Sequence, residues 1–176
     1  MINRKFIPVN IAVLTVSDTS THENDRSGDV LAKYINDSGH FLKNREILKD
    51  DRAIISSKLT EWCKRDDIDV VITTGGTGLT GRDVSVEAHR DIYEKEIDAF
   101  ATMFTIISMK KIGTSAVQSR ACAGVAFGTY LFALPGSPGA CKDGWEEILK
   151  YQLDYTHKPC NFVEIMPRLD DDKKRK

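Results

Sequence analysis

The sequence predicts an α/β fold with a mostly parallel sheet and helices on both of its faces. Short β-branched runs alternate along the chain with amphipathic stretches of helical length, and the run at residues 69–73 is apolar enough for a central strand. The length of 176 residues suffices for one hydrophobic core without disulfides or metals. We expect a single domain over residues 1–169 and a charged, disordered tail over residues 170–176.

The first half of the chain predicts the order strand, helix, strand, helix, strand. Strands are expected at residues 11–16 and 69–73, and residues 47–48 belong to a further strand between them. Ser27 is a candidate N-cap of the first helix, and Asp50 or Asp51 begins the second. Such alternation is typical of parallel strands joined by crossover helices.

The second half adds a long apolar helix and two strands. Residues 99–112 predict the helix, whose Met and Phe side chains belong to the core or to a subunit interface. Residues 123–127 and 130–134 predict two strands joined by a tight turn. The Pro- and Gly-rich stretch at residues 135–139 then separates these strands from a further helix.

The composition excludes several classes of protein. A net charge of -1 gives no electrostatic reason to expect a nucleic-acid partner. No apolar stretch has the length of a signal peptide or a membrane span, so we expect a cytoplasmic protein without a membrane partner. The cysteines lack zinc-ligand spacing and are expected to be reduced, mostly packed thiols: Cys63, Cys122, Cys141 and Cys160.

Polar or glycine-rich loops follow four of the predicted strands. One begins at Ser17 and Asp18, and the others span residues 49–51, 73–83 and 135–139. Ligands of open parallel sheets bind at the carboxyl ends of the strands. We therefore expect a ligand site at the rim where these loops meet.

The loop of Gly75, Gly76, Thr77 and Gly78 is the candidate floor of that site. Glycines let the backbone approach a ligand closely, and successive amides can bind an anion. The alternative is a tight strand-to-helix connection that binds nothing. The loop lacks both the Gly-Lys-Ser/Thr of a phosphate-binding P-loop and the Gly-x-Gly-x-x-Gly of a dinucleotide site.

Acidic side chains near this loop are candidate ligands of Mg²⁺, which prefers oxygen donors. Asp83 follows the glycine loop, and either Asp50 or Asp51 could face the site while the other caps a helix. Asp83 has the same alternative role as a helix cap. Arg120 could bind phosphate through two hydrogen bonds, although an exposed arginine is its simpler interpretation.

Together these motifs resemble the MoaB/MogA family of molybdenum-cofactor biosynthesis. The resemblance covers nearly the whole chain and is strongest at residues 72–80, which Arg82 and Asp83 follow. Further segments occur in family-like order and spacing: residues 6–8, 14–18, 25–28, 112–115, 118–121 and 134–137. Trp145 and the ending at residues 158–162 resemble the MoaB branch in particular.

The resemblance implies a three-layer α/β/α sandwich that binds molybdopterin. Active members of the family use Mg-ATP to adenylylate molybdopterin, and Asp50 and Asp83 match the two aspartates expected to be catalytic and to bind magnesium. Molybdopterin is expected on two loops: Gly75, Gly76, Thr77, Gly78, Pro135, Gly136 and Ser137. We assign four further residues to nucleotide binding: Ser17, Asp18, Ser119 and Arg120. Family members are usually trimers or dimers of trimers.

Three functions stay open at this point. The first is a molybdopterin adenylyltransferase, the second a carrier that binds molybdopterin without catalysis, and the third a nucleotide-binding domain of unrelated function. The family commonly has Pro before the first aspartate, where this chain has Lys49. Incubation with molybdopterin, Mg²⁺ and ATP discriminates among the three.

Overall fold

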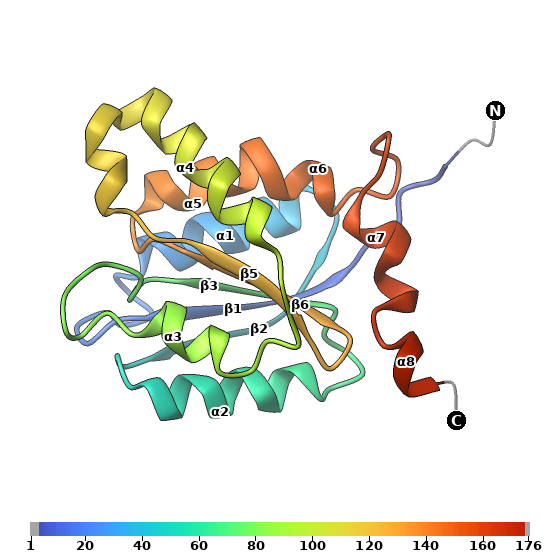
Figure 1. Cartoon of the computed structure of the whole chain (residues 1–176), viewed down its shortest axis with the longest axis horizontal. Helices are drawn as coiled ribbons and strands as arrows, with labels where there is room; N and C mark the ends of the chain where they lie inside the picture. The colour runs from blue at the N-terminus through green and yellow to red at the C-terminus, as the bar shows by residue number, and fades with distance from the viewer. Residues whose placement is uncertain (1–3, 175–176) are drawn as a thin grey trace.

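The computed structural model of the chain describes residues 4–174 and contains one six-stranded sheet with helices on both faces (Figure 1). Residues 1–3, where the N-terminal segment begins, and residues 175–176 of the charged tail lie outside the described residues. The strands are β1 (Asn10–Val16), β2 (Phe41–Leu48), β3 (Val70–Thr74), β4 (Lys95–Glu96), β5 (Cys122–Ala126) and β6 (Thr129–Leu134).

The strand order is β2-β1-β3-β6-β5-β4, and most of the sheet is parallel, as predicted. Strands β2, β1, β3 and β6 run parallel to their neighbours, whereas β5 pairs antiparallel with both β6 and β4. The turn between β5 and β6 is formed by Phe127 and Gly128, both with positive φ. All five residues of β3 are buried, which agrees with a central strand.

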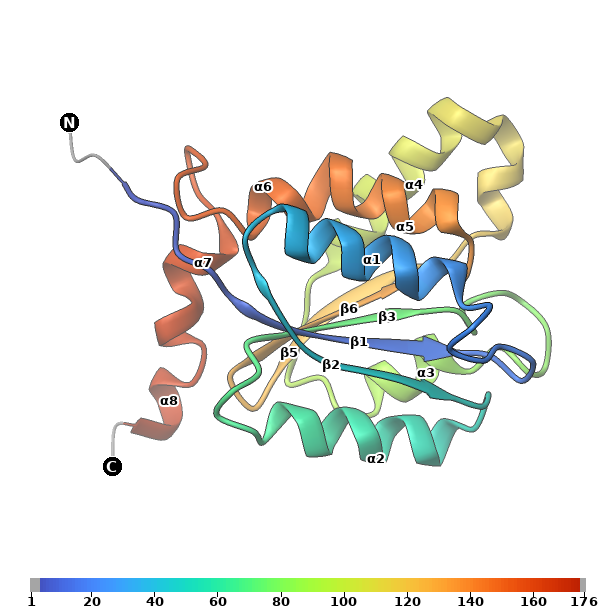
Figure 2. The ribbon, with the colours of Figure 1, turned by 180° about the vertical axis from the view of Figure 1, so that it is seen from behind.

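The helices cover the sheet in two layers, which confirms the three-layer sandwich (Figures 1 and 2). On one face α1, α4 and α5 pack with Val13 of β1 and Phe132 of β6, and on the other α2 and α3 pack with Leu14 of β1. The helical segments run in this order: α1 (Arg26–Asp37), α2 (Arg52–Cys63), α3 (Ser85–Arg90), α4 (Asp98–Ile112), η1 (Gly113–Gln118), α5 (Pro138–Gly144), η2 (Trp145–Leu149), α6 (Lys150–Gln152), α7 (Phe162–Ile165), η3 (Met166–Arg168) and α8 (Asp171–Lys174). Within residues 4–174, no helix is long and apolar enough to cross a membrane.

The structure corrects the predicted start of α1 and excludes the alternative role of Asp83 at the start of α3. Asp25 caps α1 in place of Ser27, because its carboxylate accepts from the N–H of Gly28. The residue before α3 is Val84, which makes no side-chain cap, so Asp83 is not a helix cap. Of the two candidate caps of α2, Asp50 and Asp51, the structure shows that Asp51 is the N-cap, because its side chain accepts from the N–H of Ile54.

Part of the C-terminal stretch is helical. Asp171–Lys174 forms a helical turn, where the sequence predicts a disordered tail from residue 170. Lys173 pairs with Glu94 and lies over the ring of Phe127, at the β5–β6 turn. These contacts tie charged residues of the tail to the folded chain.

Candidate functional site

Four parallel strands end together at one rim of the sheet. The register places Thr74 of β3 beside Thr15 of β1 and Leu134 of β6, and pairs Val16 with Leu48 at the end of β2. A pocket of about 430 Å³ opens at this rim. Its lining comes from the loops after these strands and from the start of α1: Thr15, Val16, Ser17, Asp18, Ser20, Asn24, Asp25, Arg26, Ser27, Asp50, Thr74, Gly75, Gly76, Arg82, Asp83, Gly136 and Pro138.

The glycine loop is held tightly against the ends of the strands. Gly75 and Gly76 have φ values of 96° and 64°, which side-chain-bearing residues rarely adopt. A Cβ on Gly75 would lie 2.2 Å from the carbonyl oxygen of Val16. The Oγ of Ser85 donates to the carbonyl of Gly75 at 2.7 Å, and the N–H of Ser85 donates to that of Gly76 at 2.8 Å. Both carbonyls are thus turned towards α3, and glycine is required for the close approach to β1.

Asp83 closes the far side of this loop. Its Oδ2 accepts from the N–H of Thr80 at 2.9 Å and from the Oγ1 of Thr80 at 2.6 Å. The backbone of Gly78 lies against the carboxylate, because a Cβ on Gly78 would lie 2.7 Å from the Oδ2 of Asp83. The hydroxyl and amide hydrogen bonds from Thr80 outweigh partial burial and hold the pKa of Asp83 below its usual range. Asp83 therefore carries a stable negative charge at the pocket wall.

Asp50 lines the pocket, whereas its neighbour Asp51 caps α2. Partial burial raises the pKa of Asp50, and the nearby carboxylates of Asp18 and Asp83 raise it further. The attraction of Arg82 offsets these effects only in part. A cation bound beside the carboxyl group of Asp50 would therefore be electrostatically favourable.

An ion pair joins two of the loops at the mouth of the pocket. The Nε of Arg82 donates to the Oδ2 of Asp18 at 3.0 Å, and its Nη2 donates to the Oδ1 at 2.8 Å. The N–H of Asp50 donates to the same Oδ1 at 3.3 Å. Asp18 therefore links the β1 loop to the β2 loop and to the segment after the glycine loop.

The second predicted loop meets the first at Gly136. A Cβ on Gly136 would lie 3.0 Å from the Cα of Gly75. The Oγ of Ser27 donates to the carbonyl of Gly136 at 2.9 Å, and the Oγ1 of Thr74 donates to that of Pro135 at 3.0 Å. These two hydrogen bonds fix the loop against α1 and β3.

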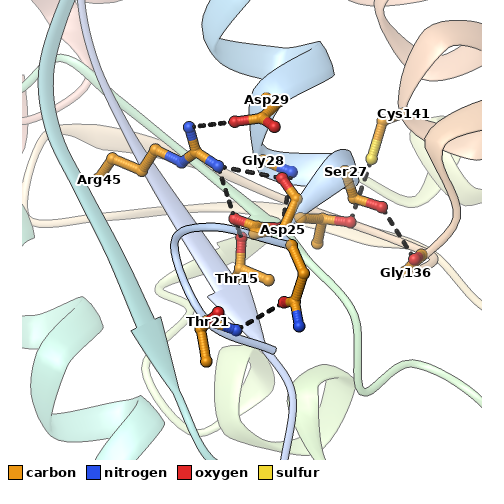
Figure 3. Close-up of polar contacts among 11 residues, drawn as sticks. Thr15, Thr21, Asp25, Ser27, Gly28, Asp29, Arg45, Gly136 and Cys141 are labelled. Atoms are coloured by element: carbon orange, nitrogen blue, oxygen red, sulfur yellow. Dashed lines mark hydrogen bonds and ion pairs between the residues drawn. The ribbon is translucent and has the colours of Figure 1, made fainter. Parts of the chain in front are cut away.

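A network centred on the buried carboxylate of Asp25 supports the start of α1 (Figure 3). The carboxylate of Asp25 accepts from the N–H of Gly28 at 2.9 Å, the Oγ1 of Thr15 at 2.8 Å and the Nη2 of Arg45 at 2.9 Å, and Arg45 also pairs with Asp29. Burial opposes ionisation of Asp25, but these three donors outweigh it and lower its pKa.

The structure brings seven of the predicted site residues to the pocket wall: Ser17, Asp18, Asp50, Gly75, Gly76, Asp83 and Gly136. It leaves six others outside the wall: Thr77, Gly78, Pro135, Ser137, Ser119 and Arg120. Thr77 is buried, and Ser137 caps α5 through the N–H of Ala140. Arg120 is half-buried and hydrogen-bonds the glycine loop, so its interpretation as a freely exposed side chain is wrong.

Residue-by-residue reasoning missed the contribution of α1 and Arg82. Asp25, Arg26 and Ser27 line the pocket from the start of α1, and Arg82 lines it beside Asp18. Residues 25–28 and Arg82 were part of the family resemblance, which is the signal that could have identified them. Asp66 lies in a separate cavity with Phe127, at the other end of the sheet.

The pocket has too few carboxylates to coordinate a metal ion with protein ligands alone. Within residues 4–174, no group of three or more His, Cys, Asp and Glu side chains is arranged to hold a metal ion. Asp50 and Asp83 nevertheless suit Mg²⁺, which usually binds one or two carboxylates together with waters and substrate phosphates.

Comparison with known proteins gives consistent matches over this site. A family model described as "Probable molybdopterin binding domain" matches residues 12–155, a range that contains every pocket-lining residue. Molybdenum cofactor biosynthesis protein B of Escherichia coli (strain K12) is 43% identical over 161 residues, which cover 92% of this chain and 95% of that protein.

Solved structures agree with these sequence matches. A crystal structure of a molybdenum cofactor biosynthesis protein B matches with a TM-score of 0.86 and 34% identity, covering 96% of this chain and 99% of the other. The tungsten cofactor synthesizing protein MoaB from Pyrococcus furiosus matches with a TM-score of 0.74 and 33% identity, covering 81% and 91% of the two chains.

Proposed function

Because the chain belongs to the molybdopterin-binding-domain family of the molybdenum cofactor biosynthesis proteins B, we propose that its rim pocket binds molybdopterin and adenylylates it with Mg-ATP. The observation that carries the catalytic part is the position of Asp50 and Asp83, which both line the pocket beside the glycine loop. Two carboxylates from different loops beside a phosphate site suit metal-assisted nucleotidyl transfer.

The glycine loop and Gly136 would hold the molybdopterin. The backbone at Gly75, Gly76 and Gly136 carries no side chains, so a flat, phosphorylated ring system can approach it closely. Backbone amides bind phosphate without a basic surface, which agrees with a chain of net charge -1. Shape and backbone contacts therefore supply this part of the binding.

Asp50 and Asp83 are the residues that would hold Mg²⁺. Asp83 is held ionised by its hydrogen bonds, and ionised Asp50 is disfavoured by burial and by its acidic neighbours, so a divalent cation relieves an electrostatic cost. When bound, Mg²⁺ neutralises charge that develops on the transferring phosphoryl group.

In the proposed reaction, a terminal phosphate oxygen of molybdopterin attacks the α-phosphorus of ATP. A new P–O bond forms there, the bond from the α-phosphorus to the bridging oxygen of the β-phosphate breaks, and pyrophosphate leaves with the bond's electron pair. The chain contributes mainly positioning and charge, as is usual in phosphoryl transfer. Arg82 lines the pocket in an ion pair with Asp18, and it would attract the nucleotide phosphates in exchange for that pair.

The test is incubation of the purified chain with molybdopterin, Mg²⁺ and ATP, followed by separation of the products. We expect adenylylated molybdopterin and an equal amount of pyrophosphate, both lost when EDTA removes the Mg²⁺. Molybdopterin that binds without forming product would instead support a carrier. ATP binding without molybdopterin binding would support the unrelated nucleotide-binding domain.

A further inference from the structure

Arg120 makes an unusual set of contacts for a residue outside the pocket wall. Its Nε donates to two carbonyls of the glycine loop, that of Thr77 at 2.9 Å and that of Gly78 at 3.1 Å. Its Nη1 and Nη2 donate to the two carboxylate oxygens of Glu87 on α3, at 2.6 Å and 3.2 Å. A single guanidinium thus joins the segment before β5, the glycine loop and α3.

The contact with Thr77 bears on Asp83 through one peptide unit. The carbonyl of Thr77 and the N–H of Gly78 belong to the same planar, trans peptide group and point in opposite directions. Arg120 holds the carbonyl end, and the Gly78 end lies against the carboxylate of Asp83, where a Cβ on Gly78 would lie 2.7 Å from the Oδ2. The orientation of this peptide plane therefore helps to set how the loop meets the Asp83 carboxylate, which Thr80 binds two residues further on.

Glu87 fixes the guanidinium in its turn. The pair is two-pronged and partly buried, with exposed side-chain fractions of 28% for Arg120 and 36% for Glu87. Two parallel hydrogen bonds restrict a guanidinium more than a single contact does. With both Nη atoms engaged by Glu87, the Nε of Arg120 stays directed at the loop.

We propose that Arg120 is a positioning residue that orients the glycine loop and Asp83, in place of the nucleotide-binding role we first assigned to it. The proposal rests on the proposed function for its kinetic consequence, because Asp83 matters to the rate only if the pocket transfers AMP. Its structural consequence, a loop ordered by Arg120, is independent of catalysis. The two consequences can be measured separately.

The structural test compares hydrogen exchange of the Gly78 and Thr80 amides in the wild type and in Arg120→Ala. A hydrogen bond to a charged group is worth enough for its loss to speed local exchange by about tenfold. Arg90→Ala is the matched control, because Arg90 also pairs with a glutamate, Glu96, but touches no carbonyl of the loop. Unchanged exchange in Arg120→Ala would overturn the proposal, whether or not the wild type transfers AMP.

The kinetic test separates positioning from direct binding of nucleotide. Misplacement of a catalytic group lowers kcat, here by roughly 100-fold, with the KM for ATP within about twofold of the wild type. Arg120→Lys, which keeps the charge, should recover part of kcat. A raised KM with unchanged kcat would show a nucleotide ligand and overturn the proposal. If Arg120→Ala does not fold, Glu87→Gln releases the guanidinium from α3 and allows the same exchange test. Faster exchange of the Gly78 and Thr80 amides would then support the proposal, and unchanged exchange would overturn it.

Discussion

Gly76 and Asp50 approach each other so closely that a Cβ on Gly76 would lie 2.7 Å from the Oδ1 of Asp50. The same Cβ would lie 2.5 Å from the Oγ of Ser85. The loop that would receive the pterin and the carboxylate that would receive the metal are therefore in direct contact. A ligand on the glycine loop necessarily lies beside Asp50.

Replacing Gly76 with Ala should damage the pocket in two ways. The φ of 64° is strained for alanine, and the new methyl group displaces the Asp50 and Ser85 side chains. We expect unfolding free energy to fall by about 1 to 3 kcal/mol and molybdopterin binding to be lost. Gly81→Ala is the control, because a Cβ there meets no atom within 4 Å. Equal binding by both variants in a titration would contradict the close fit.

Replacing Asp50 with Asn should stabilise the protein at neutral pH while removing AMP transfer. The pKa of Asp50 is raised above its ordinary value of 3.8, so its favourable contribution to folding exists below pH 3.8 and is lost as pH rises through the folded-state pKa. Without Mg²⁺, the thermal midpoint of the variant should exceed that of the wild type at pH 7, and the difference should narrow on acidification.

Asp51→Asn serves as the neighbouring control for this measurement. Asn caps a helix about as well as Asp, so the stability of α2 and of the protein should hardly change. Added Mg²⁺ should raise the midpoint of the wild type and of Asp51→Asn, but not that of Asp50→Asn. A less stable Asp50→Asn variant at pH 7 would argue against the electrostatic cost we assign to this carboxylate.

Asp25 should behave in the opposite way. Its pKa is lowered, so its contribution to stability is present above pH 3.8 and is lost as pH falls through the folded-state pKa. Asp25→Asn leaves the guanidinium of Arg45 without its buried partner, and we expect a loss of about 2 kcal/mol at pH 7 by urea unfolding. Asp29→Asn, which removes the exposed partner of Arg45, should cost much less. Equal losses in the two variants would contradict the account.

The outer side of α4 predicts self-association. Phe100 and Phe104 are buried, but four large apolar side chains of this helix are exposed: Met103, Ile106, Met109 and Ile112. We expect sedimentation as an oligomer, a trimer or a dimer of trimers, and a shift to smaller species in Met109→Lys. Ile54→Lys, on α2, is a control at another exposed apolar position. A monomeric wild type at micromolar concentration would contradict this prediction.

Most strands of the fold were predictable from the sequence, because strands that are buried on both faces of the sheet consist of continuous apolar residues. The fully buried strands β3 and β6 are continuous apolar runs and were predicted to within a residue or two. The edge strand β2 contains residues 47–48, as predicted, but its start at Phe41 had no clear signal, because its half-exposed stretch through Lys43 and Arg45 carries polar side chains. The two-residue strand β4 consists of Lys95 and Glu96, which leave no apolar signal.

The site was predictable where backbone conformation dictated the residue type. Gly75 and Gly76 are glycines because their φ values are positive, and Asp83 is indicated by its place after the glycine loop. The loop after β2 left Asp50 and Asp51 open, and only the family resemblance indicated Asp50. Contacts between residues distant in sequence left no comparable pattern in the sequence. Arg45 reaches Asp25 from a neighbouring strand, and Arg120 reaches Thr77 across 43 positions, so only the folded chain reveals these pairs.

Asp83→Asn is the most direct test of the central claim that this pocket transfers AMP to molybdopterin. The wild type, Asp83→Asn and the control Asp66→Asn, whose side chain belongs to the opposite end of the sheet, are assayed for molybdopterin affinity and for AMP transfer. We predict that all three bind molybdopterin with similar affinity, and that Asp83→Asn alone loses transfer, by about 100-fold or more. Unchanged transfer in Asp83→Asn would contradict the account.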